Sequence, residues 1–243
     1  MVRTRSQTSL RFSAAVSRDL DGAGAGRAVG ASTRRELDNG PADLAFLFFS
    51  SHYAEQADDL TVAVRRELAP RLLLGCTGEG IIGVAEEIER AAAVTLWAAR
   101  LPGVSLTPLR VSGTQDEDGV TVTGWPEDGV AEQEQPIFLV LADPFSTPVD
   151  RVLSILEDRC PGSVAVGGMA GGGHDLGENR MVLNDEVFEG GLVGVAVSGP
   201  VTIRTVVSQG CRPIGERYVV TKAESNVIHE LGEQTSPSGR VSG

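Results

Sequence analysis

The chain has 243 residues, and its 41% hydrophobic and 22% charged residues are typical of a globular protein with a substantial core. Its 33 acidic and 21 basic residues give a net charge of -12, which disfavours nucleic acids as partners because the protein repels their phosphate groups. No apolar run is long enough to span a bilayer, so we expect no membrane contact. The three cysteines lack the CxxC spacing of zinc sites, and we expect a cytoplasmic protein without a metal or another cofactor.

The first predicted elements follow a disordered tail over residues 1–9. The segment LRFSAAVS at 10–17 predicts a strand, and the Ala- and Gly-rich stretch after it predicts a helix. The run DLAFLFFSSHY at 43–53 is almost continuously apolar before it ends in small polar residues, which indicates a strand buried on both faces. A buried sheet is therefore expected in the first part of the chain.

A helix and a second strand follow this buried strand. Residues 55–70 place Leu60, Val64 and Leu68 four apart, with acids early, arginines late and a proline at the end, which predicts a helix with favourable charges at both ends. The segment RLLLG at 71–75 predicts the next strand. Strand, helix and strand form a βαβ unit, whose two strands run parallel.

The same pattern returns in the second half of the chain. An offset of 92 residues brings Phe46 onto Phe138 and Gly75 onto Gly167 without a gap. A repeat of this length is too long for a solenoid and predicts a duplicated unit instead. The two repeats extend over about 43–111 and 135–209.

Each repeat continues beyond its glycines with an apolar segment that contains a Pro–Gly or Gly–Pro pair. Residues 92–111 and 190–208 are therefore predicted to form β-hairpins. The predicted fold class is α/β, with internally duplicated β-α-β-glycine loop-β-hairpin units and mixed sheets flanked by helices. The acidic stretch 112–135 between the repeats is predicted to be a surface connection with a short hairpin around VTVTGW.

The segment LLLGCTGEGIIG at 72–83 contains the spacing G-x-G-x-x-G of dinucleotide sites, in Gly78, Gly80 and Gly83. Its context does not fit such a site, because Glu79 places a carboxylate where the pyrophosphate would lie. The segment also does not occupy the first turn between a strand and a helix. No nucleotide cofactor is predicted.

Cys76 lies at a turn after a strand, a position that can present a nucleophile above an α/β sheet. His52 and His174 follow neighbouring strand ends, so a Cys-His pair is one alternative, which would make the protein a hydrolase or a transferase. The repeat argues against it, because Gly168 occupies the equivalent position in the second copy. We therefore predict a protein that is not an enzyme and has no catalytic residues.

Both copies retain the glycines that follow their second strand, and glycines permit close approach of another group to the backbone. The glycines indicate either tight packing between the halves or a ligand site that the backbone lines, and both alternatives stay open. Ligands of parallel α/β sheets bind beyond the carboxyl ends of the strands, where a few hydroxyl, carboxylate and amide groups suit an amino acid. The predicted ligand-binding residues are Ser51, His52, Gly75, Cys76, Thr77, Gly78, Glu79, Asp143, Gly167, Gly168 and Met169.

Four of the polar residues near these strand ends also form an alternative metal site. They are His52, Glu79, Asp143 and His174, and no two of them have the spacing of a known ligand pair. We therefore predict no metal. The segment AESNVIHEL at 223–231 predicts a short helix with His229 on its surface.

The order and spacing of five segments resemble the FIST domain family (F-box and intracellular signal transduction), over about nine tenths of the chain. The segments are DLAFLFFSSHY, LLLGCTGEGIIG, VAVGGMAGGG, VLNDEVFEGGLVGVAVSG and SQGCRPIGERYVVTKAESNVIHELG. The resemblance implies a sensory module of signal transduction that is not catalytic, with an amino acid as its small ligand and a signalling protein as a further partner.

The resemblance also implies a division of the chain. Residues 10–210 correspond to a FIST N-terminal domain, and 211–231 to the start of a shortened C-terminal domain. Residues 232–243 form a polar tail. We expect the edge left at the C-terminal end to favour self-association.

Overall fold

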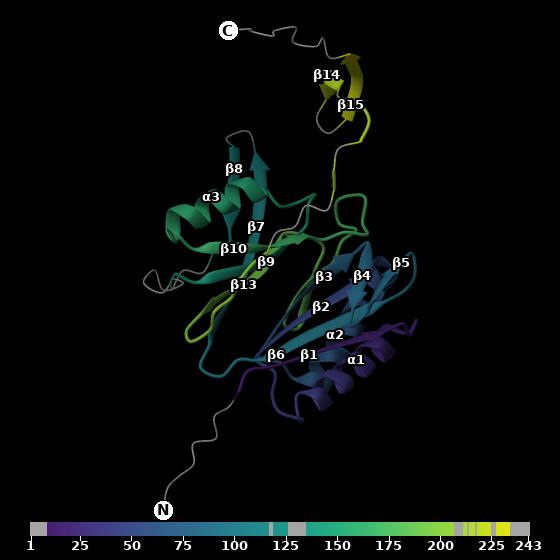
Figure 1. The fold of residues 1–243 in the computed structure, drawn as a ribbon, viewed down its shortest axis with the longest axis vertical. Coiled ribbons are helices and arrows are strands. Elements are labelled where there is room, and N and C mark those ends of the chain that lie inside the picture. Colours follow the sequence, from purple (N-terminus) through teal and green to yellow (C-terminus); the bar gives the residue numbers. More distant parts are fainter. Residues whose placement is uncertain are drawn as a thin grey trace, which may run out of the picture. The chain divides into compact units, whose positions relative to one another are not determined.

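The computed structural model describes residues 9–116, 119–125, 135–206, 211–212, 214–216, 218–224 and 227–233. They divide into two compact units, Met1–Ile203 and Arg204–Gly243 (Figure 1). The first unit carries two large sheets and all the described helices. The predicted tails lie almost wholly outside the described residues.

The described part of the first unit contains two large sheets and one small one. The first sheet has the strand order β1 (Arg11–Ser17), β6 (Val94–Arg100), β2 (Leu44–Ser50), β3 (Leu72–Gly78), β11 (Met181–Leu183) and β12 (Glu186–Phe188). The second sheet has the order β10 (Val164–Met169), β9 (Ile137–Ala142), β13 (Leu192–Ser198), β7 (Ser105–Asp116) and β8 (Gly119–Thr123). The small sheet pairs β4 (Gly80–Gly83) with β5 (Glu86–Glu89).

The described helices of this unit are α1 (Gly22–Glu36), the 3₁₀ helix η1 (Ser51–Gln56), α2 (Ala57–Leu68) and α3 (Val149–Arg159). The prediction of α2 is confirmed, with Leu60, Val64 and Leu68 buried. Both predicted βαβ units are also confirmed, because β2 runs parallel to β3 and β9 runs parallel to β10. The fold class is α/β, as predicted.

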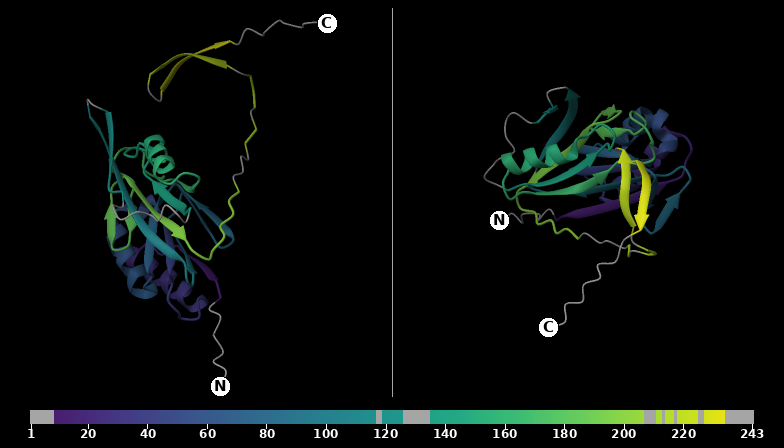
Figure 2. Two further views of the ribbon diagram at one scale, coloured as in Figure 1. Left: turned by 90° about the vertical axis from the view of Figure 1, so that its left-hand side faces the viewer. Right: turned by 90° about the horizontal axis from the view of Figure 1, so that it is seen from above.

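The first unit has four layers, because each sheet is covered on both faces (Figures 1 and 2). Alternate residues of β2 explain the first two layers. Leu47 and Phe49 pack with α1 and α2, whereas Phe46 and Phe48 face the second sheet. On the far face of the second sheet, Val152 and Leu156 of α3 complete the fourth layer. This alternation gives β2 its continuous apolar sequence.

Four strands have the same order and relative direction in the two sheets. In the first sheet β6 lies antiparallel between β1 and β2, and β3 follows parallel to β2. In the second sheet β13 lies antiparallel between β7 and β9, and β10 follows parallel to β9. The evolutionary duplication that the sequence suggests stays a prediction.

The predicted hairpin at 92–111 is wrong, and so is that at 190–208 over its described residues 190–206, where β13 is followed by no second strand. β6 belongs to the first sheet and β7 to the second, so the chain crosses between the sheets at Pro102 and Gly103. A hairpin cannot form at either place because the first strand has no free edge for the segment that follows it. β6 pairs with β1 and β2, and β13 pairs with β9 and β7. The expected short hairpin near VTVTGW does form, because β8 pairs with the end of β7.

A hairpin from the second half of the chain completes the first sheet. β11 pairs antiparallel with β3, with Met181 opposite Cys76 and Leu183 opposite Leu74. β12 then forms the outer strand beside β11. The two halves of the first unit are therefore joined by backbone pairing as well as by side-chain packing.

The described part of the second unit contains the hairpin of β14 (Tyr218–Glu224) and β15 (Val227–Glu233). The predicted helix at 223–231 is wrong, because Val227 and Ile228 are branched at Cβ and β14 provides an antiparallel partner. His229 lies on β15, and its Nε2 atom is 3.6 Å from a carboxylate oxygen of Glu224. None of the described helices combines the length and apolarity needed to cross a membrane.

Candidate functional site

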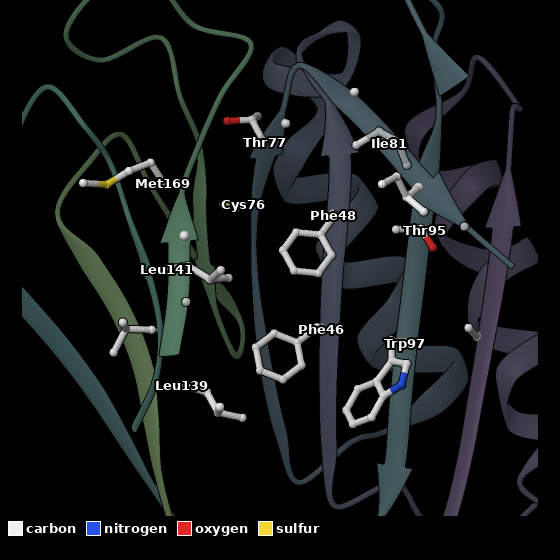
Figure 3. Close-up of a pocket in the computed structure, with 18 of the residues that line it drawn as sticks. Phe46, Phe48, Cys76, Thr77, Ile81, Thr95, Trp97, Leu139, Leu141 and Met169 are labelled. Atoms are coloured by element: carbon white, nitrogen blue, oxygen red, sulfur yellow. The ribbon is translucent and has the colours of Figure 1, made fainter. Parts of the chain in front are cut away.

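A cavity of about 740 Å³ lies between the two sheets of the first unit (Figure 3). The first sheet contributes one wall and β9 with β10 the opposite wall, while β4 adds residues at one end. The labelled lining residues are Phe46, Phe48, Cys76, Thr77, Ile81, Thr95, Trp97, Leu139, Leu141 and Met169.

The cavity lies where Gly168 of β10, paired with Leu141, faces large residues of the first sheet. Gly168 lines it, and a Cβ atom added to Gly168 would meet no heavy atom within 4 Å. Elsewhere between the sheets Val193 and Val195 of β13 fill the space against the first sheet. Gly168 of β10 therefore leaves open a space of the kind that Val193 and Val195 fill on β13.

One wall of the cavity is aromatic. The rings of Phe46 and Phe48 are nearly parallel, with an interplanar angle of 5° and centroids 6.2 Å apart. The Trp97 ring lies 5.8 Å from that of Phe46 and is tilted by 52°. Phe12 of β1 extends the row, with its ring 5.8 Å from Trp97. We call Phe12, Trp97, Phe46 and Phe48 the aromatic row.

The described lining includes no Asp, Glu, Lys, Arg or His side chain. The hydroxyl of Thr77 donates to Asn179 Oδ1 at 3.1 Å, and that of Thr95 donates to the Ala15 carbonyl at 3.2 Å. Burial raises the pKa of the Cys76 thiol to about 12, so the thiol is protonated at neutral pH. The site is therefore suited to bind apolar surface.

A buried polar network lies beside the cavity and joins the ends of β3 and β9. Asn179 Oδ1 accepts from Thr77, and Asn179 Nδ2 donates to Asp143 Oδ1 at 2.9 Å. The other carboxylate oxygen of Asp143 accepts from the backbone N–H and the hydroxyl of Ser146, at 2.8 and 2.5 Å. The Ser146 hydroxyl oxygen in turn accepts from the Gly191 N–H. The network ties strand ends of both sheets to the loops around them.

The second glycine loop packs against the first. The Gly171 N–H donates to the Thr77 carbonyl at 3.1 Å. Gly172 has a φ of +87°, and a Cβ atom there would lie 3.2 Å from the Gly78 carbonyl oxygen and from Ser51 Cβ. The packing alternative for these glycines is therefore supported, because the two loops contact each other. The ligand-site alternative stays a prediction, and Gly78, Gly167 and Gly168 line the adjoining cavity.

The predicted ligand-binding residues fall into two groups. Six of them line the cavity, namely Cys76, Thr77, Gly78, Gly167, Gly168 and Met169. The others are not among its described lining residues. Ser51, His52 and Glu79 are exposed, whereas Asp143 is buried in the polar network. Gly75 lies in β3, where a Cβ atom would be 2.2 Å from the Leu47 carbonyl oxygen, so its role is to pack against β2.

Neither histidine of the catalytic alternative is among the described residues that line the cavity with Cys76. His52 Nδ1 lies 3.2 Å from the Ser50 hydroxyl, and His174 is an exposed residue whose N–H donates to Glu178. Within the described part of the chain, no group of three or more His, Cys, Asp and Glu side chains is placed to hold a metal ion.

Sequence reasoning missed the aromatic row and Asn179. The row could have been found from β2, because residues two apart in a strand share a face and Phe46 and Phe48 are such a pair. Trp97 joins them through the register of β6 with β2, in which it lies opposite Phe46. Asn179 carries no local signal, since its partners come from distant parts of the chain.

Comparison with known proteins gives a family and several relatives. The family model of the FIST N domain matches residues 43–234. An uncharacterized protein of Mycobacterium tuberculosis is 37% identical over 223 residues, which cover 92% of this chain and 57% of the relative. An uncharacterized protein of Mycobacterium bovis is 34% identical over 199 residues, or 82% of this chain and 50% of the relative. The chain thus spans about half the length of the curated relatives it matches.

Proposed function

Because this chain belongs to the FIST family through its FIST N domain, a sensory domain associated with signal transduction, we propose that it binds a small molecule in the cavity between its two sheets. The observation that carries the proposal is the cavity itself. Its volume of about 740 Å³ is that of typical small-molecule sites, and its lining is largely apolar. Residues of both sheets line it, so a ligand there would contact both halves of the first unit.

A ligand in this position can act as a signal if it binds one arrangement of the sheets more tightly than another. The polar network of Thr77, Asn179 and Asp143 lies beside the cavity and holds loops from both halves. Small shifts of β9 or β10 on ligand binding would therefore move these loops. We propose that a signalling protein reads this change, that the domain works in the cytoplasm, and that it is not catalytic.

The amino acid that the sequence suggests remains one candidate within this proposal. An amino acid with an apolar side chain could place that side chain against the cavity wall. Its ammonium and carboxylate groups would need to stay in contact with water, because the described lining offers them no charged partner.

The test is a thermal-shift screen of amino acids and small apolar metabolites, with nucleotides as charged comparators. At a hundredfold excess over its Kd, a true ligand should raise Tm by about 5 °C or more. The Gly168→Leu variant should lose this shift, because the new side chain enters the cavity from a position with open space around it.

Val164→Leu is the matched control, since Val164 lies on the same strand, is 48% exposed and is not among the described lining residues. It should retain the shift. A ligand response that persists in Gly168→Leu would place the ligand elsewhere and contradict the proposal. The absence of any saturable response in a folded sample would favour a protein-interaction adaptor without a small ligand.

A further inference from the structure

We propose that the ligand of this cavity is an uncharged, planar aromatic molecule that stacks on the aromatic row. This inference rests on the proposed function, because it names the class of ligand for the same site. It follows from three properties of the cavity, which are the geometry of the rings, the absence of charged groups from the described lining and the shape of the opposite wall.

The first property is the aromatic wall. Phe46, Phe48 and Trp97 line the cavity and come from the adjacent strands β2 and β6 (Figure 3). Their centroid spacings of 5.8 and 6.2 Å leave each ring in contact with its neighbour. Aromatic side chains offer a planar ligand offset or edge-to-face contacts, which contribute about 0.5–1.5 kcal/mol beyond the burial of apolar area.

The second property is the lack of charge compensation. A carboxylate or ammonium group transferred from water to an apolar site loses hydration energy unless a partner replaces it. The described lining has no ionisable group other than the Cys76 thiol, and burial keeps that thiol neutral. The hydroxyl hydrogens of Thr77 and Thr95 are already donated to protein oxygens. A neutral ligand is therefore favoured over a zwitterion or an anion.

The third property is the wall that faces the rings. On β10 the cavity is lined by Val166, Gly167, Gly168 and Met169, and on β9 by Leu139 and Leu141. Gly168 adds no side chain, so this wall is recessed opposite the first sheet. Met169 is 53% exposed, and a thioether makes favourable contacts with an aromatic ring. A flat molecule can thus lie between the two sheets with apolar contact on both faces.

The decisive experiment compares matched pairs of ligands by isothermal titration calorimetry. Indole and L-tryptophan share a ring but differ in the zwitterionic group, so indole should bind at least about tenfold more tightly. The aromatic 2-naphthol and its saturated analogue decahydro-2-naphthol differ in planarity. The naphthol should bind about two- to tenfold more tightly, which is the range that an aromatic pair contributes.

Two single-tryptophan variants test whether the aromatic row is the site. Trp125→Phe leaves Trp97 as the fluorophore. Trp97→Phe leaves Trp125, which follows β8, packs against Phe138 of β9 and lies beneath Arg159. The probe is 4-nitrobenzyl alcohol, a neutral nitroaromatic quencher. Saturable quenching is expected when Trp97 is present alone, and only collisional quenching, linear in concentration, when Trp125 is present alone.

The outcomes separate this inference from the proposed function. If L-tryptophan or the saturated alcohol binds more tightly than its partner and Gly168→Leu removes that binding, the cavity is a ligand site but the inference is wrong. Saturable quenching of Trp125 alone would also overturn it. If no member of either pair binds and the wider thermal-shift screen shows no response, both proposals fail.

Discussion

Asn179 connects the two halves of the first unit through a single buried side chain. Its amide group serves the Thr77 hydroxyl, the Gly173 N–H and the Asp143 carboxylate, at distances of 2.9–3.1 Å. A polar group in a buried position costs free energy when its partner is removed, because water cannot replace the lost hydrogen bond. The amide therefore satisfies three polar groups at once, and the Ser146 hydroxyl is a second side-chain donor to the Asp143 carboxylate.

Replacing this amide should destabilise the protein. Asn179→Ala removes the hydrogen bonds that Thr77, Gly173 and Asp143 make to the amide, so we expect the free energy of unfolding to fall by about 2–3 kcal/mol. Urea denaturation followed by circular dichroism measures the change. His174→Ala, at an exposed position in the same loop, should alter stability by less than about 0.5 kcal/mol. Equal stability of the two variants would show that the network contributes little.

The cysteines provide a second prediction for single residues. Cys76 is 3% exposed and burial raises its pKa to about 12, whereas Cys211 is exposed. Only the thiolate reacts with iodoacetamide, so at pH 8 Cys211 should be alkylated first and Cys76 slower by orders of magnitude. Peptide mass spectrometry at successive times gives the two rates. Alkylation of Cys76 at a higher rate than Cys211 would contradict this prediction and favour the Cys-His alternative.

The raised pKa of Cys76 also has a consequence for stability. The folded protein retains the thiol proton above pH 9, where the unfolded chain loses it. Ionisation of Cys76 therefore does not change the free energy of unfolding below pH 9. Between pH 9 and about 12 it lowers the free energy of unfolding, because only the unfolded chain releases the proton. Cys76→Ala should remove that part of the alkaline decline.

At the scale of elements, the hairpin of β4 and β5 contains a strained turn. Val84 in this turn has a φ of +53°, a conformation that is unfavourable for a side chain branched at Cβ. The hairpin of β11 and β12 has Asn184 at the equivalent place, with a φ of +56°. Asparagine tolerates this region, so the second hairpin shows which residue type suits the turn.

Val84→Asn should therefore stabilise the protein by about 1 kcal/mol. Thermal unfolding in the absence of ligand measures the gain as a higher Tm. Ala85→Asn is the control, because Ala85 is the next residue of the same turn and does not have a positive φ. A gain of the same size in both variants would indicate a general effect of asparagine rather than relief of strain.

The same scale explains what sequence could predict. The apolar residues of β2, α2 and β3 show the local patterns of a strand, a helix and a strand, and those of β9, α3 and β10 repeat them. Both βαβ units can therefore be predicted from short windows of sequence. The hairpins at 92–111 and 190–208 were predicted from their turn residues alone. Turn chemistry does not specify which strand edges are free, and the pairing of β7 with β13 depends on residues far along the chain.

For the whole molecule, the sequence predicted the glycine loops of the candidate site but not its aromatic row. The glycine loops were located because both repeats contain them, and Gly168 with Cys76 does line the cavity. The exposed Glu79 and the buried Asp143 do not line its described part. The aromatic row required knowledge of how β1, β6 and β2 pair, because its four rings come from three strands.

The pairing of β11 with β3 sets the earliest point at which the first sheet can be completed during synthesis. On the ribosome β3 emerges early, but its open edge acquires a partner only after residues 181–183 have left the exit tunnel. Until then the nascent chain presents the unpaired backbone edge of β3. A slow passage between these two segments would therefore prolong the time during which this edge is open to pairing with another strand.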